Sequence, residues 1–223
     1  CGMTQCDVDP SIYSKYELDD KGRTKEYLFV ITWTDDVRYF GTPRFVTKYE
    51  RDISQHIKCK FEGLSKEFVS ITISHDLKSN TLELTQVKYW ENAVERFKEF
   101  LPPNGPKKRG TPLSISEYAL LTDPTDEEVK AGSHLPFPQL IGVLQYPAAF
   151  TKLEMRFAVS SLSRFRGRWS AVHFSAALKA LEYGFTTRAT GILYKKPVEQ
   201  KDTNVLIAYA DSGFGTPRSQ GCS

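Results

Sequence analysis

Apolar and polar residues alternate over several short segments in the first part of the chain, a pattern that predicts half-buried β-strands. Asp35 and Asp36 separate two of these segments, which therefore predict a β-hairpin with an acidic turn. A second hairpin is predicted further on, with its turn over residues 77–80. The predicted strands are residues 12–16, 26–33, 37–40, 68–73 and 81–84.

Apolar residues at steps of three and four predict amphipathic helices between and after the hairpins. Pro147 is expected to end one helix early, because proline lacks the backbone N–H and clashes with the preceding turn. Residues 102–117 are a Pro/Gly-rich basic connector, and 122–134 are polar. The helical pattern covers residues 44–61, 86–100 and 169–185, with broken runs over 137–165, and short strands are predicted at 191–194 and 205–211. Together these elements predict an α+β fold.

The composition is that of an ordinary folded protein. The 223 residues suffice for one large or two small domains, and 40% hydrophobic with 26% charged residues excludes wholesale disorder. No apolar run reaches the roughly 18 residues of a membrane span, so no membrane partner is expected. The four cysteines lack zinc-ligand spacing, which favours a reduced intracellular compartment. The chain starts at Cys1 rather than Met, which suggests a piece of something longer.

The basic charge is concentrated in one part of the chain. The net charge is +3, yet residues 151–200 carry nine lysines and arginines against three glutamates. Such a segment is typical of contact with a polyanion, and the ordinary alternative is a solvated helix face.

Asp35 and Asp36 are the sharpest candidates for chemistry. Two carboxylates at a hairpin tip can supply oxygen ligands to Mg²⁺. A rigid hairpin could hold them for two-metal phosphoryl transfer. The alternative is a solvated turn, where aspartate is common.

The run Ile31-Thr32-Trp33-Thr34-Asp35-Asp36 resembles the tyrosine-x-Asp-Asp hairpin of reverse transcriptases, with Trp33 in the place of the usual tyrosine. Over nearly its whole length the chain resembles the reverse transcriptase of copia-type LTR retrotransposons. The blocks that carry the resemblance, in the family's order, are residues 6–13, 68–73, 84–89, 111–113, 139–146, 157–165, 169–183 and 191–194.

The resemblance implies three regions. Residues 1–85 would be the C-terminal part of the polymerase palm, with antiparallel hairpins and helices. Residues 86–190 would be a helical thumb with the basic connector. Residues 191–223 would be a connection and the truncated start of a ribonuclease H domain, whose first strand and first catalytic acid, Asp211, are the last recognisable features. A strand-end aspartate beside a glycine turn is the alternative for Asp211.

The resemblance also implies a reaction. Asp35 and Asp36 would be catalytic, metal-binding acids that hold Mg²⁺ for RNA-directed DNA synthesis. The third palm acid and the nucleotide-binding fingers have no counterpart here, so the chain is expected to be inactive in isolation. The implied partners are an RNA template, a DNA primer or RNA–DNA hybrid, dNTP in the complete enzyme, and the rest of a retrotransposon polyprotein. The implied location is a cytoplasmic particle or the nucleus.

Four residues are candidates for nucleic-acid contact. Trp33 adjoins the acids, and Gln139, Gly142 and Tyr146 share one helical face. Gly142 would admit a nucleic-acid backbone closely. Helix packing at Gly142 and a core role for Tyr146 are the alternatives. The hairpin from Phe68 to Leu84 resembles the primer-positioning hairpin.

Other functions remain open. A non-catalytic nucleic-acid-binding remnant of a decayed element would have the same fold, and an α+β interaction module is the generic alternative. A Ser-His-Asp hydrolase lacks support, because no Gly-x-Ser-x-Gly occurs and His173 lies within a predicted helix. The polymerase interpretation requires Asp35 and Asp36 at an exposed hairpin tip that faces a basic helix.

Overall fold

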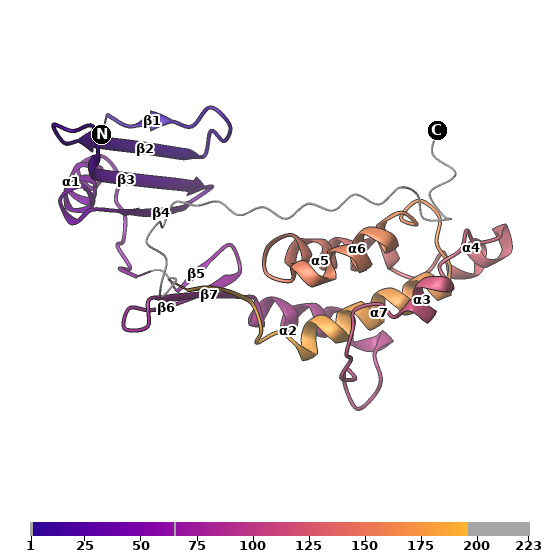
Figure 1. Ribbon diagram of the computed structural model, residues 1–223. Coiled ribbons are helices and arrows are strands. Elements are labelled where there is room, and N and C mark those ends of the chain that lie inside the picture. The colour runs from indigo at the N-terminus through magenta and orange to yellow at the C-terminus, as the bar shows by residue number, and fades with distance from the viewer. Residues whose placement is uncertain (1, 65, 196–223) are drawn as a thin grey trace.

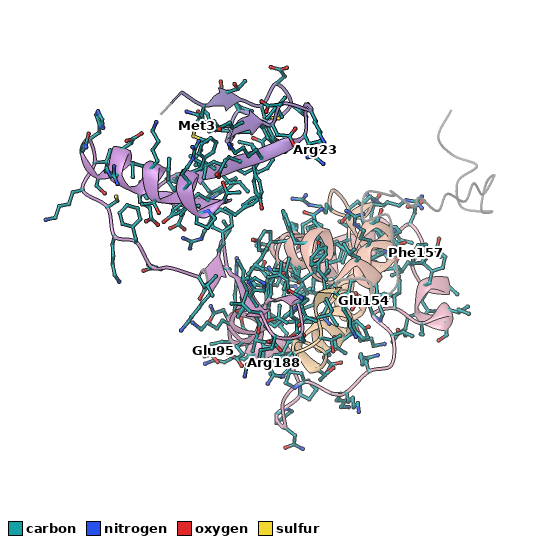
Figure 2. The ribbon with its side chains drawn as sticks, turned by 60° about the vertical axis from the view of Figure 1, so that its left-hand side comes forward. Met3, Arg23, Glu95, Glu154, Phe157 and Arg188 are labelled. Atoms are coloured by element: carbon teal, nitrogen blue, oxygen red, sulfur yellow. The ribbon has the colours of Figure 1, made fainter. Side chains whose placement is uncertain are left out.

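Two antiparallel sheets and a helical body make up the α+β fold of the computed structural model, which describes residues 2–64 and 66–195 (Figure 1). The first sheet, with one helix on it, is one body, and the second sheet lies between it and the other helices (Figures 1 and 2). The strand orders are β1-β2-β3-β4 and β5-β6-β7-β8. The strands are β1 (Thr4–Gln5), β2 (Ile12–Leu18), β3 (Thr24–Trp33), β4 (Asp36–Gly41), β5 (Glu67–Phe68), β6 (Ile71–Asp76), β7 (Thr81–Thr85) and β8 (Ile192–Lys195). The α-helices are α1 (Pro43–Ser54), α2 (Val87–Arg96), α3 (Ile115–Ala119), α4 (Asp126–Gly132), α5 (Phe137–Phe150), α6 (Arg156–Ser163) and α7 (Ala171–Thr186).

The first sheet buries one face against α1. Leu28 and Val30 of β3 pack on Phe45 and Tyr49, and all four side chains are buried. The helix ends at Ser54, so the predicted extent of 44–61 is wrong at its end. Ile57 continues the apolar spacing but is 60% exposed, so extending the helix would bury little there, and helices owe most of their stability to such burial.

The second sheet departs from the predicted pattern at its start. Residues 68–73 are not one strand, because Val69 and Ser70 form a turn between β5 and β6. Both have positive φ, 47° and 58°. Serine is common in turns, but valine is not, and neither is the glycine that positive φ favours, so the sequence carried only a weak signal for this turn. The predicted turn over 77–80 and the strand at 191–194 are confirmed, and that strand, β8, pairs with β7.

The helical body has the larger core. Trp90 of α2 is fully buried and lies against Gly184 of α7, where an added Cβ would come within 2.1 Å of the indole ring. The glycine thus lets α2 and α7 approach closely. The other apolar side chains of this core with no exposed surface are Phe137, Leu140, Ile141, Leu144, Met155, Leu162, Ala177, Ala180 and Leu181.

Pro147 does not end α5, contrary to the expectation from the sequence. The helix continues to Phe150 with the proline inside it. Proline leaves the carbonyl of Val143, four residues earlier, without its helical donor. The Tyr89 hydroxyl donates to that carbonyl at 2.8 Å, so a side chain from α2 replaces the missing backbone hydrogen bond.

Ion pairs hold the basic connector on α3 and α7. The Arg109 guanidinium donates from Nε to buried Glu182 at 2.7 Å and from Nη1 to Glu117 at 3.1 Å. Lys179 of α7 pairs with Glu117 at 2.9 Å. Burial opposes ionisation of Glu117, but hydrogen bonds from Ser114 and the Lys179 ammonium outweigh it and lower the pKa of Glu117 from 4.5 to about 2.

We expect Gly184→Ala to lower the free energy of unfolding by about 1–3 kcal/mol, because the new methyl group overpacks the Trp90 ring. The matched control is Gly142→Ala in α5, where an added Cβ meets open space. Alanine there should stabilise the helix by up to about 1 kcal/mol. Urea unfolding of both variants measures the difference, and equal effects would contradict the packing argument.

The lowered pKa of Glu117 predicts an acid-dependent loss of stability. A carboxyl with a depressed folded-state pKa stabilises fully above its unfolded value of about 4.5, and that contribution disappears as pH falls from 4.5 towards 2. Glu117→Gln should therefore flatten the decline of the urea midpoint across this window and lower the midpoint at pH 7. Glu127→Gln, an exposed acid of α4, is the control. Parallel pH curves for wild type and Glu117→Gln would refute the assignment.

Candidate nucleic-acid interface

The acidic pair lies where the sequence predicted it. Trp33 and Asp36 are the last cross-strand pair of β3 and β4, and Thr34 and Asp35 form the two-residue turn. Thr34 has a positive φ of 49°, as tight hairpin turns often require. Trp33, Asp35 and Asp36 are all exposed. The hairpin thus presents two carboxylates and an indole at its tip.

The tip is connected to the second hairpin through Arg38. Its guanidinium donates to the Glu67 carbonyl at 2.6 Å and lies 5.3 Å from the centre of the Phe68 ring. Because Arg38 is two residues from Asp36 on the same strand, this contact ties the acidic end of the hairpin to β5.

Asp35 and Asp36 fit a divalent cation only in part. Their oxygens suit Mg²⁺, but within residues 2–64 and 66–195 no group of three or more His, Cys, Asp or Glu could hold a metal ion. Two exposed carboxylates leave most coordination positions to water or to ligands from elsewhere. The described part of the chain therefore offers half of a site.

Helix α5 exposes an uncharged face. None of its fourteen residues is charged, and Gln139, Gly142 and Gln145 lie exposed along one side. A Cβ at Gly142 would meet nothing within 4 Å, so the glycine does not serve helix packing. The Gln145 amide donates to Ser163 of α6 at 3.3 Å, which joins the two helices into one surface. The sequence reasoning missed Gln145, although its helical spacing could have identified it.

Tyr146 does not share this free face. It is half-buried, and its hydroxyl donates to the Val69 carbonyl in the turn between β5 and β6. The ring packs on Tyr89 and Phe150, with centroids 5.3 and 5.0 Å away. The structure thus favours a packing role for Tyr146.

The basic segment is only partly available. Lys152 is buried, with its ammonium on the Thr187 carbonyl at 2.7 Å, and Lys179 and Arg188 pair with Glu117 and Glu91. Helix α7 is therefore not basic in effect. Arg156 and Arg166 are exposed and form no ion pair with any described residue. These arginines place unpaired charge on α6 and the turn after it, and Lys195 at the end of β8 is likewise exposed with no ion pair to a described residue. Phe157, next to Arg156, is 65% exposed and points outward (Figure 2).

Two other residues that the sequence singled out remain to be placed. Asp211 lies outside the described residues. His173 is buried at the start of α7, where its Nδ1 accepts from the Ser170 backbone N–H at 3.1 Å. It completes a helix cap, and burial lowers its pKa, which fits a structural histidine. Among the described residues, no helix is long and apolar enough to cross a membrane.

Comparison with known proteins identifies distant relatives. A Retrovirus-related Pol polyprotein from transposon TNT 1-94 of Nicotiana tabacum is 25% identical over 178 residues, which are 78% of this chain and 13% of the relative. A second relative, the Retrovirus-related Pol polyprotein from transposon RE1 of Arabidopsis thaliana, is 26% identical over 195 residues. The match covers 86% of this chain and 12% of the relative. A putative transposon Ty5-1 protein of Saccharomyces cerevisiae is 23% identical, and the match covers 84% of this chain and 57% of the relative.

These relatives support an origin in a retrotransposon Pol polyprotein, of which the chain spans a small part. No protein-family model matches the chain, and no solved structure matches it.

Proposed function

We propose that this chain is the palm-to-thumb part of an RNA-directed DNA polymerase encoded by a retrotransposon. The observation that carries the proposal is the presence of two exposed surfaces whose elements both contact residues 67–70, one through Arg38 and the other through Tyr146. One is the exposed Asp35–Asp36 tip, and the other is the uncharged face of α5 that contains Gln139, Gly142 and Gln145. The Pol polyprotein relatives support the same class of protein.

The α5 face suits the minor groove of an RNA–DNA hybrid. That groove is wide and shallow and is recognised mainly by shape. Gly142 permits close approach, and the amides of Gln139 and Gln145 can donate hydrogen bonds to base edges or sugars. Arg156 and Arg166 on and after α6 would neutralise backbone phosphates beside the groove.

The acidic tip would hold the reacting end of the primer. Asp35 and Asp36 would supply two carboxylate ligands, and Trp33 beside them would pack against the bound nucleic acid. Mg²⁺, when bound there, supplies the positive charge that phosphoryl transfer requires. Because no third acid joins them among the described residues, the chain alone is expected to bind duplex without extending it.

A second candidate is a duplex-binding remnant without chemistry. The half-formed metal site favours it, since the described residues bring no third ligand to the tip. The two candidates share the α5 and α6 surface and differ only in whether a complementary acid completes the site.

Asp35→Asn, introduced into a polymerase that includes the upstream palm, should lower primer extension by at least a hundredfold, because the variant loses a charged metal ligand. Duplex binding should change less than twofold. Asp20→Asn is the control, since Asp20 is an exposed turn acid outside the tip. Extension by the Asp35→Asn variant at the wild-type rate would refute the catalytic assignment, and absence of extension with restored palm would favour the remnant.

The 223-residue chain should bind a labelled RNA–DNA primer–template with an affinity that falls by roughly one to two orders of magnitude between 50 and 200 mM salt, as about three phosphate contacts require. Gly142→Glu should weaken binding at least tenfold, because it places a carboxylate against the groove. Gly110→Glu adds the same charge at an exposed connector glycine with open space and should bind like wild type. Equal losses in both variants would show that only net charge matters.

A further inference from the structure

The turn between β5 and β6 is strained. Val69 and Ser70 have φ values of 47° and 58°, in the left-handed region that favours glycine. A β-branched residue is a rare occupant of that region. Only two residue pairs, Glu67 with Thr72 and Phe68 with Ile71, join β5 to β6. So short a ladder offers little to hold such a turn, and strained residues persist only where their surroundings determine them.

Tyr146 of α5 supplies the missing restraint. Its hydroxyl donates to the Val69 carbonyl, within the strained turn itself. The phenol is held in turn by the Tyr89 ring, 5.3 Å away, whose own hydroxyl is fixed on the Val143 carbonyl. Burial raises the pKa of Tyr146, so its hydroxyl remains a hydrogen-bond donor at neutral pH.

The same short segment is held from the opposite direction. Arg38, close to the acidic tip, binds the Glu67 carbonyl and covers the Phe68 ring. Residues 67–70 therefore contact both β4, which begins at Asp36, and the helix that carries Gln139 and Gly142. These contacts join the two surfaces on which the proposed function depends.

We infer that Tyr146 is a positioning residue: its hydrogen bond to the strained Val69–Ser70 turn fixes the acidic tip relative to the uncharged face of α5, so that both meet one duplex. The inference rests on the proposed function. It gives the Tyr146 hydroxyl a partner within the protein rather than a partner in the nucleic acid. The residue acts through the turn, and a phenylalanine there would retain the ring packing but lose the restraint.

The test begins with hydrogen exchange of the 223-residue chain over residues 67–72. In Tyr146→Phe, protection of this segment should fall at least tenfold, while the core around Trp90 stays protected. Tyr183→Phe is the matched control, because its hydroxyl contacts Glu154 at 3.5 Å and not the turn. Unchanged exchange in Tyr146→Phe would overturn the inference.

The second measurement is affinity for the RNA–DNA primer–template. Tyr146→Phe should bind about fivefold more weakly with the same salt dependence, because no phosphate contact is lost. Adding Ser70→Gly should restore most of the affinity, since glycine adopts a positive φ without strain. A change in the salt dependence, or no rescue by glycine, would instead place Tyr146 in direct contact with the duplex.

The outcomes separate the two proposals. If wild type binds no hybrid, the proposed function fails, and the positioning role fails with it. If wild type binds but Tyr146→Phe binds equally well despite lost protection, only the positioning role is overturned.

Discussion

The contact of Trp90 with Gly184 is the constraint on which the second half of the structure depends. Helix α2 follows directly from β7, and α7 leads to β8. When the indole lies on the glycine, the two helices are brought together and so are the strands attached to them, which pair Leu84 with Ile192. Gly191 shows how tight this closure is, because a Cβ there would lie 1.9 Å from the Leu84 carbonyl oxygen. The contact of Trp90 with Gly184 thus favours the pairing of β7 with β8, two strands about a hundred residues apart in the sequence.

Apolar burial builds each body, whereas polar contacts connect them. The cores around Trp90 and around Phe45 are separate clusters. Arg38 of the first body donates a hydrogen bond to the Glu67 carbonyl of the second body. Within the second body, Tyr146 donates to the Val69 carbonyl. Single hydrogen bonds contribute only about 1 kcal/mol each, so the spacing of the acidic tip and α5 is set by weak terms. Under the inference above, the Tyr146 hydroxyl would therefore affect the position of the acidic tip relative to α5 more than it affects the stability of the fold.

Periodicity predicted the elements that bury a continuous face, including α2, α7 and the acidic hairpin with its exposed Asp35 and Asp36. It failed where long-range contacts override local preference. The Val69–Ser70 turn lacks the glycine that its positive φ values favour and accepts a hydrogen bond from Tyr146 of α5. Pro147 stays helical while the Tyr89 hydroxyl donates to the carbonyl that the proline leaves without a helical donor. Helical spacing grouped Tyr146 with Gln139 and Gly142, but it could not show that a distant turn takes up the tyrosine hydroxyl. The structure was therefore needed to show that the Tyr146 hydroxyl contacts the protein while Gln139 and Gly142 remain exposed.

Charge along the sequence and charge on the surface differ for a related reason. Residues 151–200 are strongly basic by composition, but folding brings Glu117 and Glu91 from other elements to Lys179 and Arg188 and buries Lys152. The described cations of this segment that form no ion pair include Arg156 and Arg166, on α6 and in its following turn beside a helix with no charge at all, and Lys195 at the end of β8. If the proposed function holds, so few cations beside the uncharged face of α5 would make attraction to phosphates insufficient for recognition. Under the proposed function, discrimination would come from the fit of α5 to a groove, and Gly142 at the centre of the face would be the residue on which that fit depends.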